Sequence, residues 1–342
     1  MSKSHFEYPF SGEEPYIWNL PSYIRIGNSI GKFLPKKGKK RDKNVKIWLA
    51  NDKQNTPLKE TDFPLIFIVH NGRRFLPSFL AHYRNLGVTR FVCVDDASVD
   101  GTKEYLLKQP DVDIHLSNVR FKTAARGKTW RELLAAKYGK NRWYLNVDVD
   151  EYLFTGCNKK MNILNYAKKL YSNGIYRLPA AMIDMIPRDT SDPAILSDDK
   201  MPWEICKFFD LSGYSGYVTR GGIKLYGGPR KRLWNADAEL IKYPLIYWDE
   251  HTSLGVSIHS PWPVYQNHAP ICGVLLHFKI FSDVKTVTQE TLQSAQYFDN
   301  NREYKLMYEF FSSNQSLKLT DEKSIYFEGE ETLIENRMVK IA

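Results

Sequence analysis

The chain has 342 residues, of which 43% are hydrophobic and 25% are charged, and its net charge at pH 7 is +9. This length and hydrophobic content support a full core, in one large domain or a domain with an appendage. The four cysteines are scattered without a C-x-x-C pair, which excludes a zinc ribbon and a disulfide framework. No apolar run approaches the ~20 residues of a membrane-spanning helix. We therefore expect a cytoplasmic protein.

Residues 1–60 are predicted to form an N-terminal basic extension. Between Lys32 and Lys46 it carries eight basic residues and one acidic residue. Two interpretations remain open for this segment. It is either a solvated linker or a contact with the anionic inner face of the cell membrane, where each basic residue contributes ~1 kcal/mol. Nucleic acid is not predicted as a partner, because aromatic residues are not interleaved with the basic ones.

From residue 64 onward, apolar runs alternate with apolar residues at helical spacing. The runs predict buried strands, and the spacing predicts amphipathic helices. The predicted strands are 64–70, 90–94, 112–116 and 143–147, and the predicted helices are 76–86, 103–108 and 130–138. This order predicts an α/β fold with a mostly parallel, Rossmann-like central sheet, right-handed crossovers and flanking helices.

Acidic residues follow the second predicted strand. Asp95 and Asp96 stand at its carboxyl end, where ligands bind in open α/β sheets. The alternative is a structural turn, in which Asp100 or Thr102 caps the following helix. The position at the strand end makes Asp95 and Asp96 candidates for ligand binding.

A second acidic motif, Asp148-Val149-Asp150-Glu151, follows the strand 143–147. Three acidic residues in four positions are costly to bury unless a cation neutralises them. Carboxylates at D-x-D spacing suit a hard divalent ion such as Mg²⁺ or Mn²⁺. A solvated loop or a helix cap is the alternative. In a parallel sheet, both acidic motifs fall on one edge.

Several motifs in this order resemble family 2 type glycosyltransferases of the GT-A fold, and more narrowly the bacterial branch with a DxDEF metal motif. The matching runs are His70–Gly72, Ala81–Arg84, Leu86–Val88, Val94–Ser98, Asp100–Thr102, Asp148–Tyr152, Gly227–Leu233 and Leu275–Lys279. The resemblance extends over roughly residues 62–340. The chain departs from the branch at Asn71-Gly72-Arg73, where Arg-Asn-Glu is usual.

The resemblance implies a domain organisation and an activity. A GT-A domain over 61–282 would divide into a nucleotide-binding half, 61–155, and an acceptor half, 156–282, followed by a C-terminal helical segment, 283–342. The implied activity is metal-dependent hexosyl transfer, expected to be inverting. The sugar would move from a nucleotide-sugar donor, with UDP favoured, to a bacterial surface glycan or its lipid-linked precursor.

The resemblance also assigns roles to single residues. Asp150 is the first metal ligand, and Asp148 binds the ribose or reaches the metal through water. His277 completes the metal sphere, although a core histidine is an equal alternative. Asp96 accepts a hydrogen bond from the donor base, with Asp95 beside it.

Other assignments are more open. The donor phosphates are expected near Arg126 and Lys128, and near Arg230 and Arg232, where a solvated basic turn is the alternative. An inverting enzyme also needs a carboxylate base for the acceptor hydroxyl. Candidates for the base are Asp249 and Glu250, and equally Asp210 and Glu204.

Two other classes of protein remain open. One is a non-catalytic protein that binds a nucleotide or a glycan on the same scaffold. The other is a nucleotidyltransferase, which also places carboxylates and divalent metals at strand ends. A nucleotidyltransferase is expected to carry a glycine-rich basic loop after its first strand. Here that loop is Asn71-Gly72-Arg73-Arg74, which is basic but poor in glycine.

Overall fold

The computed structural model of the protein describes residues 4–11, 44–50, 57–255, 257–294, 296, 301–313 and 316–341. Residues 32–43 of the basic segment 32–46 lie outside the described part of the chain, so the membrane contact stays a prediction. Within the described ranges, no helix is both long enough and apolar enough to span a bilayer.

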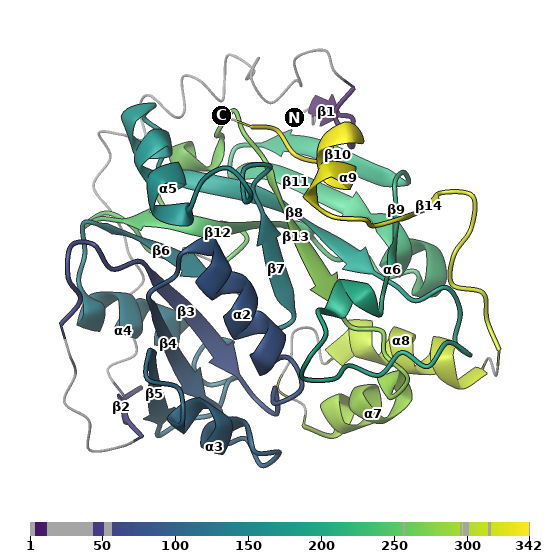
Figure 1. Ribbon diagram of the computed structural model, residues 1–342, viewed down its shortest axis with the longest axis horizontal. Coiled ribbons are helices and arrows are strands. Elements are labelled where there is room, and N and C mark those ends of the chain that lie inside the picture. The colour runs from purple at the N-terminus through teal and green to yellow at the C-terminus, as the bar shows by residue number, and fades with distance from the viewer. Residues whose placement is uncertain are drawn as a thin grey trace.

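Among the described residues, a nine-stranded sheet crosses the molecule in the order β2-β5-β4-β3-β6-β12-β8-β13-β7 (Figure 1). Strands β5, β4, β3, β6, β8 and β13 run parallel to one another, whereas β2, β12 and β7 run against them. The bounds are β2 (Ile47–Leu49), β3 (Pro64–Val69), β4 (Arg90–Asp95), β5 (Val112–Ser117), β6 (Arg142–Asn146), β7 (Glu151–Phe154), β8 (Arg177–Met185), β12 (Ile241–Trp248) and β13 (Gly273–Phe278).

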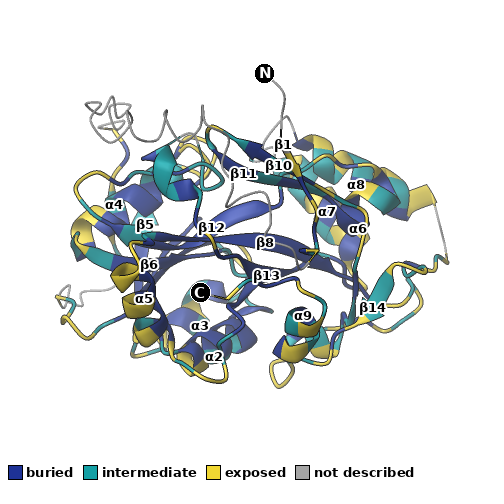
Figure 2. Cartoon of the chain, turned by 90° about the horizontal axis from the view of Figure 1, so that it is seen from above, coloured by how far each residue is buried: buried dark blue, intermediate teal, exposed yellow. Residues whose placement is uncertain are grey.

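Helices cover both faces of this sheet, which is why its central strands are continuously apolar. Figure 2 shows α2, α3, α5 and α9 on one side and α4, α6, α7 and α8 on the other. The helices are α2 (Leu76–Leu86), α3 (Thr102–Leu107), α4 (Lys128–Tyr138), α5 (Ile163–Ser172), α6 (Gly228–Trp234), α7 (Val284–Ser294), α8 (Arg302–Ser313) and α9 (Glu330–Glu335). Two 3-10 turns, Pro202–Glu204 and Val264–Asn267, complete the helical elements of the described residues.

The strands and helices predicted between residues 64 and 147 are confirmed, with ends that differ by one or two residues. Local signals account for this agreement. Helix α2 has a proline in its first turn and ends at Gly87, whose φ of 104° lets its N–H reach the carbonyls of Tyr83 and Arg84. Strand β3 is buried along its whole length.

Two smaller sheets were not predicted. One contains β1 (Ser4–Phe6), β10 (Tyr214–Thr219) and β11 (Gly222–Gly227), and the other pairs β9 (Phe208–Asp210) with β14 (Ser324–Tyr326). Parts of the predicted N-terminal extension therefore join sheets, through β1 and β2. The segment after residue 283 contains α7, α8 and α9, as well as β14.

The core has two parts. The larger apolar cluster lies on both faces of the nine-stranded sheet. The smaller one includes Ile186, Trp234, Ile280, Met307 and Phe311, and it packs α6 and α8 against the segments that follow β8 and β13. The carboxyl-terminal segment is thereby fixed beside the edge where the parallel strands end.

Candidate metal and nucleotide site

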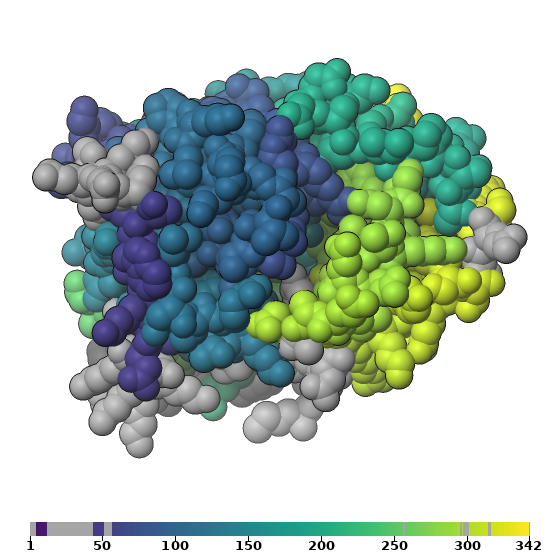
Figure 3. All heavy atoms as spheres, turned by 90° about the horizontal axis from the view of Figure 1, so that it is seen from below, coloured from purple at the N-terminus to yellow at the C-terminus, as the bar shows by residue number. Residues whose placement is uncertain are grey.

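The carboxyl ends of β4, β3, β6, β8 and β13 meet at one edge of the sheet, together with the first residues of β12 and β7. Figure 3 looks onto this edge and shows the N-terminal half on one side and the α7–α8 segment on the other. We call it the carboxyl edge. Both predicted acidic motifs lie on it, because the sheet has the predicted parallel order through β4, β3 and β6.

The D-x-D motif forms the turn between β6 and β7. The Asp148 N–H donates to Glu151 Oε2 over 3.0 Å, and the Glu151 N–H donates to the Asp148 carbonyl over 3.1 Å. Glu151 begins β7 and pairs with His277 of β13. The turn therefore places Glu151 opposite His277, although the two residues are far apart in sequence.

Asp150, Glu151 and His277 offer metal-ligand atoms that all lie within 4.8 Å of one another. The distance from His277 Nε2 to Asp150 Oδ2 is 3.5 Å. Glu151 and His277 are buried, whereas the Asp150 side chain is 24% exposed. A ligand therefore approaches this cluster from the side of Asp150. The predicted grouping of Asp150 with His277 is present in the structure.

Asp184 and Arg230 fix the orientation of His277. Asp184 is at the end of β8, and its Oδ1 lies 2.7 Å from His277 Nδ1. Arg230 of α6 holds the same carboxylate with two hydrogen bonds, of 2.6 and 2.5 Å. A proton on Nδ1 that is donated to Asp184 leaves the lone pair of Nε2 directed at Asp150. A carboxylate behind a ligating histidine is the usual support of a metal-binding imidazole.

Two buried cations hold Asp148. Arg131 of α4 donates from Nη2 to Asp148 Oδ1 over 2.5 Å, and Lys242 of β12 donates from Nζ to Asp148 Oδ2 over 2.8 Å. Lys242 also forms an ion pair with Glu151. Sequence reasoning missed both cations, because a lysine in an apolar strand and an arginine in an amphipathic helix do not reveal their partners. A charged residue within the apolar run of β12 was the one available signal.

These ion pairs set the pKa values of the acidic turn. Burial would raise the pKa of Asp148, but Lys242 and Arg131 hold it below its usual range. Burial likewise opposes ionisation of Asp150, and His277 lowers its pKa. Burial raises the pKa of Glu151, and Lys242 offsets this only in part. Burial lowers the pKa of His277, but Asp150 and Asp184 together raise it above the usual value.

The charges of this cluster do not balance without one more cation. Its acidic groups are the carboxylates of Asp148, Asp150, Glu151 and Asp184, and its permanent cations are Arg131, Lys242 and Arg230. Buried carboxylates need a cation nearby. A protonated His277 would supply it in the absence of a metal, in line with its raised pKa, and a divalent ion would supply it in place of that proton.

The β4 end of the carboxyl edge is built differently. Both oxygens of Asp96 are engaged, one by Arg120 Nε at 2.8 Å and the other by the Phe121 N–H at 3.3 Å. Asp95 is buried, and its Oδ1 has no hydrogen-bond partner within the described part of the chain. Burial raises the pKa of Asp95. The orphaned oxygen makes Asp95, rather than the predicted Asp96, the carboxylate with an acceptor to spare.

Carboxylates hold the two arginines of the loop after β3. Arg73 forms a bidentate ion pair with Asp198, at 3.0 and 2.7 Å, and stacks over the ring of Tyr105. Arg74 donates from Nη1 to both oxygens of Asp283, at 2.8 and 2.6 Å. The loop therefore ties the N-terminal half to α7 and its neighbours.

The predicted phosphate-binding residues fall into two groups. Arg126 and Lys128 lie where the loop after β5 enters α4, and Arg126 is exposed. Arg230 is 2% exposed and binds Asp184, while Arg232 is held by Asp210 and by the carbonyl of Leu319. The prediction that Arg230 and Arg232 face the phosphates is therefore wrong, because buried carboxylates occupy both guanidinium groups.

The predicted base residues Asp249 and Glu250 lie at the opposite edge of the sheet. Strand β12 is antiparallel, so its last residue, Trp248, pairs with Arg142, the first residue of β6. The acidic turn follows the last residue of β6. The five residues of β6 rise ~3.3 Å each, so its two ends are much farther apart than a hydrogen bond can reach. This assignment needs correction: neither carboxylate can take a proton from an acceptor bound at Asp150.

The two alternative base candidates are also engaged elsewhere. Glu204 accepts a hydrogen bond from the Met201 N–H at 2.7 Å within a 3-10 turn. Asp210 is buried, and it accepts from Arg232 and from the Ser324 hydroxyl. Both carboxylates therefore stabilise local structure.

Helix α8 covers the side of the cluster that faces Arg230. Glu303 accepts from Arg230 Nη1 at 3.3 Å and from Lys279 Nζ at 3.4 Å. Burial would raise the pKa of Glu303, but Lys279 and Arg230 lower it to about 2. Lys279 also lies 4.8 Å from the centre of the Tyr304 ring. Sequence reasoning did not place any residue of the C-terminal segment at the site.

Comparisons with known proteins give little to set beside this geometry. No family model and no curated protein match the sequence. Among solved structures, HddC from Yersinia pseudotuberculosis is 11% identical over 54% of this chain and 74% of that chain, with a TM-score of 0.27. UDP-glucose pyrophosphorylase from Acinetobacter baumanii is 8% identical over 75% and 88%, with a TM-score of 0.25.

The inositol-1-phosphate CTP transferase from T. maritima is 10% identical over 82% of this chain and 96% of that chain, with a TM-score of 0.25. At these TM-scores, none of the three similarities decides the fold or the activity of this chain. The function has to be inferred from the site.

Proposed function

We propose that the protein is a metal-dependent glycosyltransferase with a GT-A-like fold. It would transfer a sugar from a nucleotide-sugar donor, with UDP favoured, to a glycan or a lipid-linked acceptor. The observation that carries this proposal is the convergence of Asp150, Glu151 and His277, with ligand atoms within 4.8 Å of one another. They lie at the carboxyl edge of a mostly parallel sheet, where such folds bind nucleotides.

The cluster fits a divalent metal ion. Carboxylate oxygens suit Mg²⁺ and Mn²⁺, and an added imidazole nitrogen favours Mn²⁺ over Mg²⁺. Asp150 and His277 would hold the ion, with Glu151 beside them. Asp184 would keep the histidine in the ligating tautomer. When bound, the ion would offset the charge that grows on a departing diphosphate.

The chain's own residues suggest how a donor lies along the edge. Asp95, with its orphaned oxygen at the end of β4, offers an acceptor to the nucleoside. Strands β4, β3 and β6 are neighbours in the sheet, and the acidic turn with Asp150 follows β6, so a donor would extend from Asp95 toward Asp150 along this edge. Arg126 and Lys128, at the start of α4, supply positive charge on that path.

The ion pairs of Arg73 and Arg74, in the loop after β3, favour a glycosyltransferase over a nucleotidyltransferase. A nucleotidyltransferase needs the basic groups of this loop to hold a triphosphate. Here Arg73 and Arg74 are each occupied by a bidentate carboxylate, Asp198 and Asp283. Gly72 packs against β3, because an added Cβ would lie 2.6 Å from Val69 Cγ2. The loop is built as a structural tie.

The test is the release of nucleotide from a panel of UDP-, GDP- and dTDP-sugars with Mn²⁺. We expect turnover of at least one donor, loss of turnover in EDTA, and a decrease of ~10³ in Asp150→Ala. Asp249→Ala, at the opposite edge of the sheet, is the matched control and should retain full activity. Unchanged turnover in EDTA would contradict the proposal.

Two results separate the alternative classes. Release of pyrophosphate from a nucleoside triphosphate and a sugar 1-phosphate would identify a nucleotidyltransferase. Binding of a nucleotide-sugar without any release of nucleotide, with or without added glycosides, would identify a non-catalytic binding protein.

A further inference from the structure

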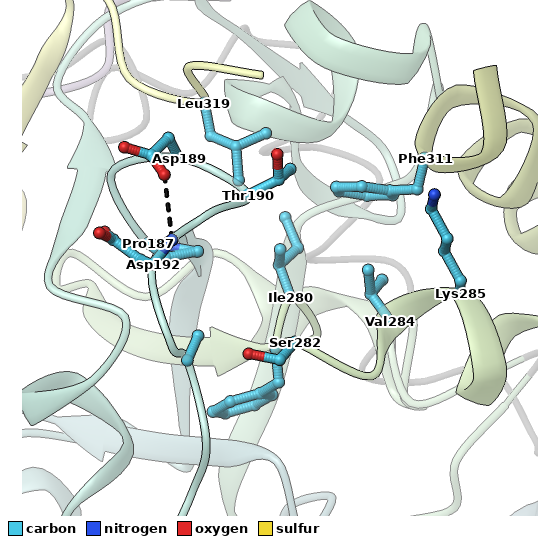
Figure 4. A pocket seen from close by; sticks show the side chains of 12 residues that line it. Pro187, Asp189, Thr190, Asp192, Ile280, Ser282, Val284, Lys285, Phe311 and Leu319 are labelled. Carbon is cyan, nitrogen blue, oxygen red and sulfur yellow. Dashed lines mark hydrogen bonds between the residues drawn. The ribbon is translucent and has the colours of Figure 1, made fainter. Parts of the chain in front are cut away.

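A pocket of about 220 Å³ lies between the loop after β8 and the helices α7 and α8 (Figure 4). Its lining is divided by chemistry. Apolar groups come from Ile280, Val284, Phe311 and Leu319, and polar groups come from Asp189, Thr190, Asp192, Ser282 and Lys285. In Figure 4 the loop with Asp189 and Asp192 forms one side, and Phe311 and Lys285 form the other.

The pocket adjoins the candidate metal cluster. Pro187, in its wall, is three residues after Asp184, and Ile280 is three residues after His277. Three residues span at most ~11 Å even when fully extended. Helix α8 contributes to both places, with Glu303 near the cluster and Phe311 in the pocket. The pocket therefore adjoins the segments that carry Asp184 and His277.

The size and lining of the pocket suit one sugar ring. An engineered cavity of about 150 Å³ binds benzene, so about 220 Å³ leaves room for a substituted six-membered ring. The loop's own hydrogen bonds use Asp189 Oδ1 and Asp192 Oδ2. In Figure 4 the carboxylates of Asp189 and Asp192 are directed away from the apolar side of the pocket, which offers the ring of Phe311.

We propose that this pocket is the subsite for a neutral sugar unit of the acceptor, an assignment that rests on the proposed glycosyltransferase function. The order of groups along the carboxyl edge supports it. The nucleoside end lies at β4, the metal cluster lies on the β6–β7 turn and β13, and the pocket is lined by the segments that follow β8 and β13. Asp189 and Asp192 disfavour an anionic ligand such as a phosphate.

The test compares two tryptophan substitutions near the start of α7. Ser282→Trp fills the pocket from its exposed wall. Thr286→Trp is the matched control, because Thr286 is also exposed but does not line the pocket. The probes are the methyl glycosides of glucose, galactose, mannose, rhamnose and N-acetylglucosamine, and their binding is read by saturation-transfer NMR with UDP and diamagnetic Mg²⁺ present. Melting temperatures show that both variants are folded.

We expect at least one glycoside to receive saturation from the wild-type protein and from Thr286→Trp, and at least a tenfold weaker effect in Ser282→Trp. Absence of glycoside binding in the wild-type protein, or equal binding in both variants, would overturn the assignment. Loss of saturation on the sugar of an intact UDP-sugar, rather than on the glycoside, would make the pocket a donor subsite instead. Because binding is read without turnover, a failure here is distinct from a wild-type protein that hydrolyses no donor.

Discussion

The two ends of the strand pair β6 and β12 carry acidic residues in opposite situations. At one end, Glu250 pairs with Lys140 over 2.6 Å, and its side chain is 65% exposed. At the other end, Asp148 and Glu151 share Lys242, which is 9% exposed. The first pair contributes little because water competes for both partners. At the second end Lys242 and Glu151 are buried, whereas the Asp148 side chain is 37% exposed, so the loss of a partner costs most at Glu151. The comparison teaches that strand direction decides which carboxylates form a site.

Removal of the buried cation should have the largest effect on stability. Lys242→Met leaves Asp148 and Glu151 with no partner on β12, and we expect the free energy of unfolding to fall by ~3 kcal/mol at neutral pH. The control is Lys140→Met at the exposed end, which should change it by no more than ~0.5 kcal/mol. Urea denaturation measures the free energy of unfolding of both variants. Equal losses of stability would show that the ion pairs at the two ends of the strand pair contribute equally.

Loss of the carboxylate behind His277 should come next. Asp184→Asn removes the acceptor that fixes the imidazole, and we expect Mn²⁺ affinity to fall 10- to 100-fold by calorimetry. Asp210→Asn is the matched control, because Asp210 is another buried carboxylate that binds an arginine of α6 through two hydrogen bonds. Both variants should lose stability, but only Asp184→Asn should lose metal affinity. Equal affinity in the two variants would reduce Asp184 to a packing role.

The pH dependence of His277 should give a smaller effect, on the order of 1 kcal/mol. Its pKa is raised in the folded protein, chiefly by Asp150 and then by Asp184, against the opposing effect of burial. Its pairing therefore stabilises the metal-free protein fully below the usual pKa of about 6.5, and this contribution is lost as the pH rises through the higher folded value.

The measurement is the difference in melting temperature between the metal-free wild type and His277→Gln at pH 6 and pH 9. We expect the difference to shrink toward pH 9. Mn²⁺ affinity of the wild type should change in the opposite sense, because the departing proton frees Nε2. A difference that stays constant with pH would show that His277 is neutral throughout.

The exposed end should give the smallest effect of all. Asp249→Asn and Glu250→Gln together should leave donor turnover and melting temperature within error, because both residues lie at the edge away from the acidic turn. A decrease of tenfold or more in turnover would restore the original assignment of these residues as bases. It would also break the comparison between the two ends.

The parallel part of the fold was predictable because its signals are local. Strands such as β3 are apolar along their whole length, and α2 has a proline at its start and Gly87 at its end. The position of the acidic turn followed from that order. Strand β12 was not predicted, and its direction depends on its neighbours β6 and β8 rather than on its own residues. That failure misplaced Asp249 and Glu250 and hid Lys242.

The partners of buried charges were unpredictable for the same reason. The chain shows Arg230 within a basic run that reads as a surface turn, but α6 directs its guanidinium to Asp184, 46 residues earlier. Arg120 likewise binds Asp96, the carboxylate that the resemblance assigns to the donor base. Metal-ligand candidates were easier, because Asp150 and His277 belong to motifs with a characteristic spacing.

The wide sequence separation of the site also bears on how the protein folds. Lys242 lies 91 residues after Glu151 and 94 after Asp148, and His277 lies 93 residues after Asp184. Contacts between residues so far apart in sequence form late in folding, because the long loop between them must close first and its closure costs conformational entropy. During synthesis, the acidic turn therefore emerges long before its cations and stays hydrated until β12 inserts between β6 and β8. Metal binding at the proposed site would then report that the whole sheet, and not only its N-terminal half, has assembled.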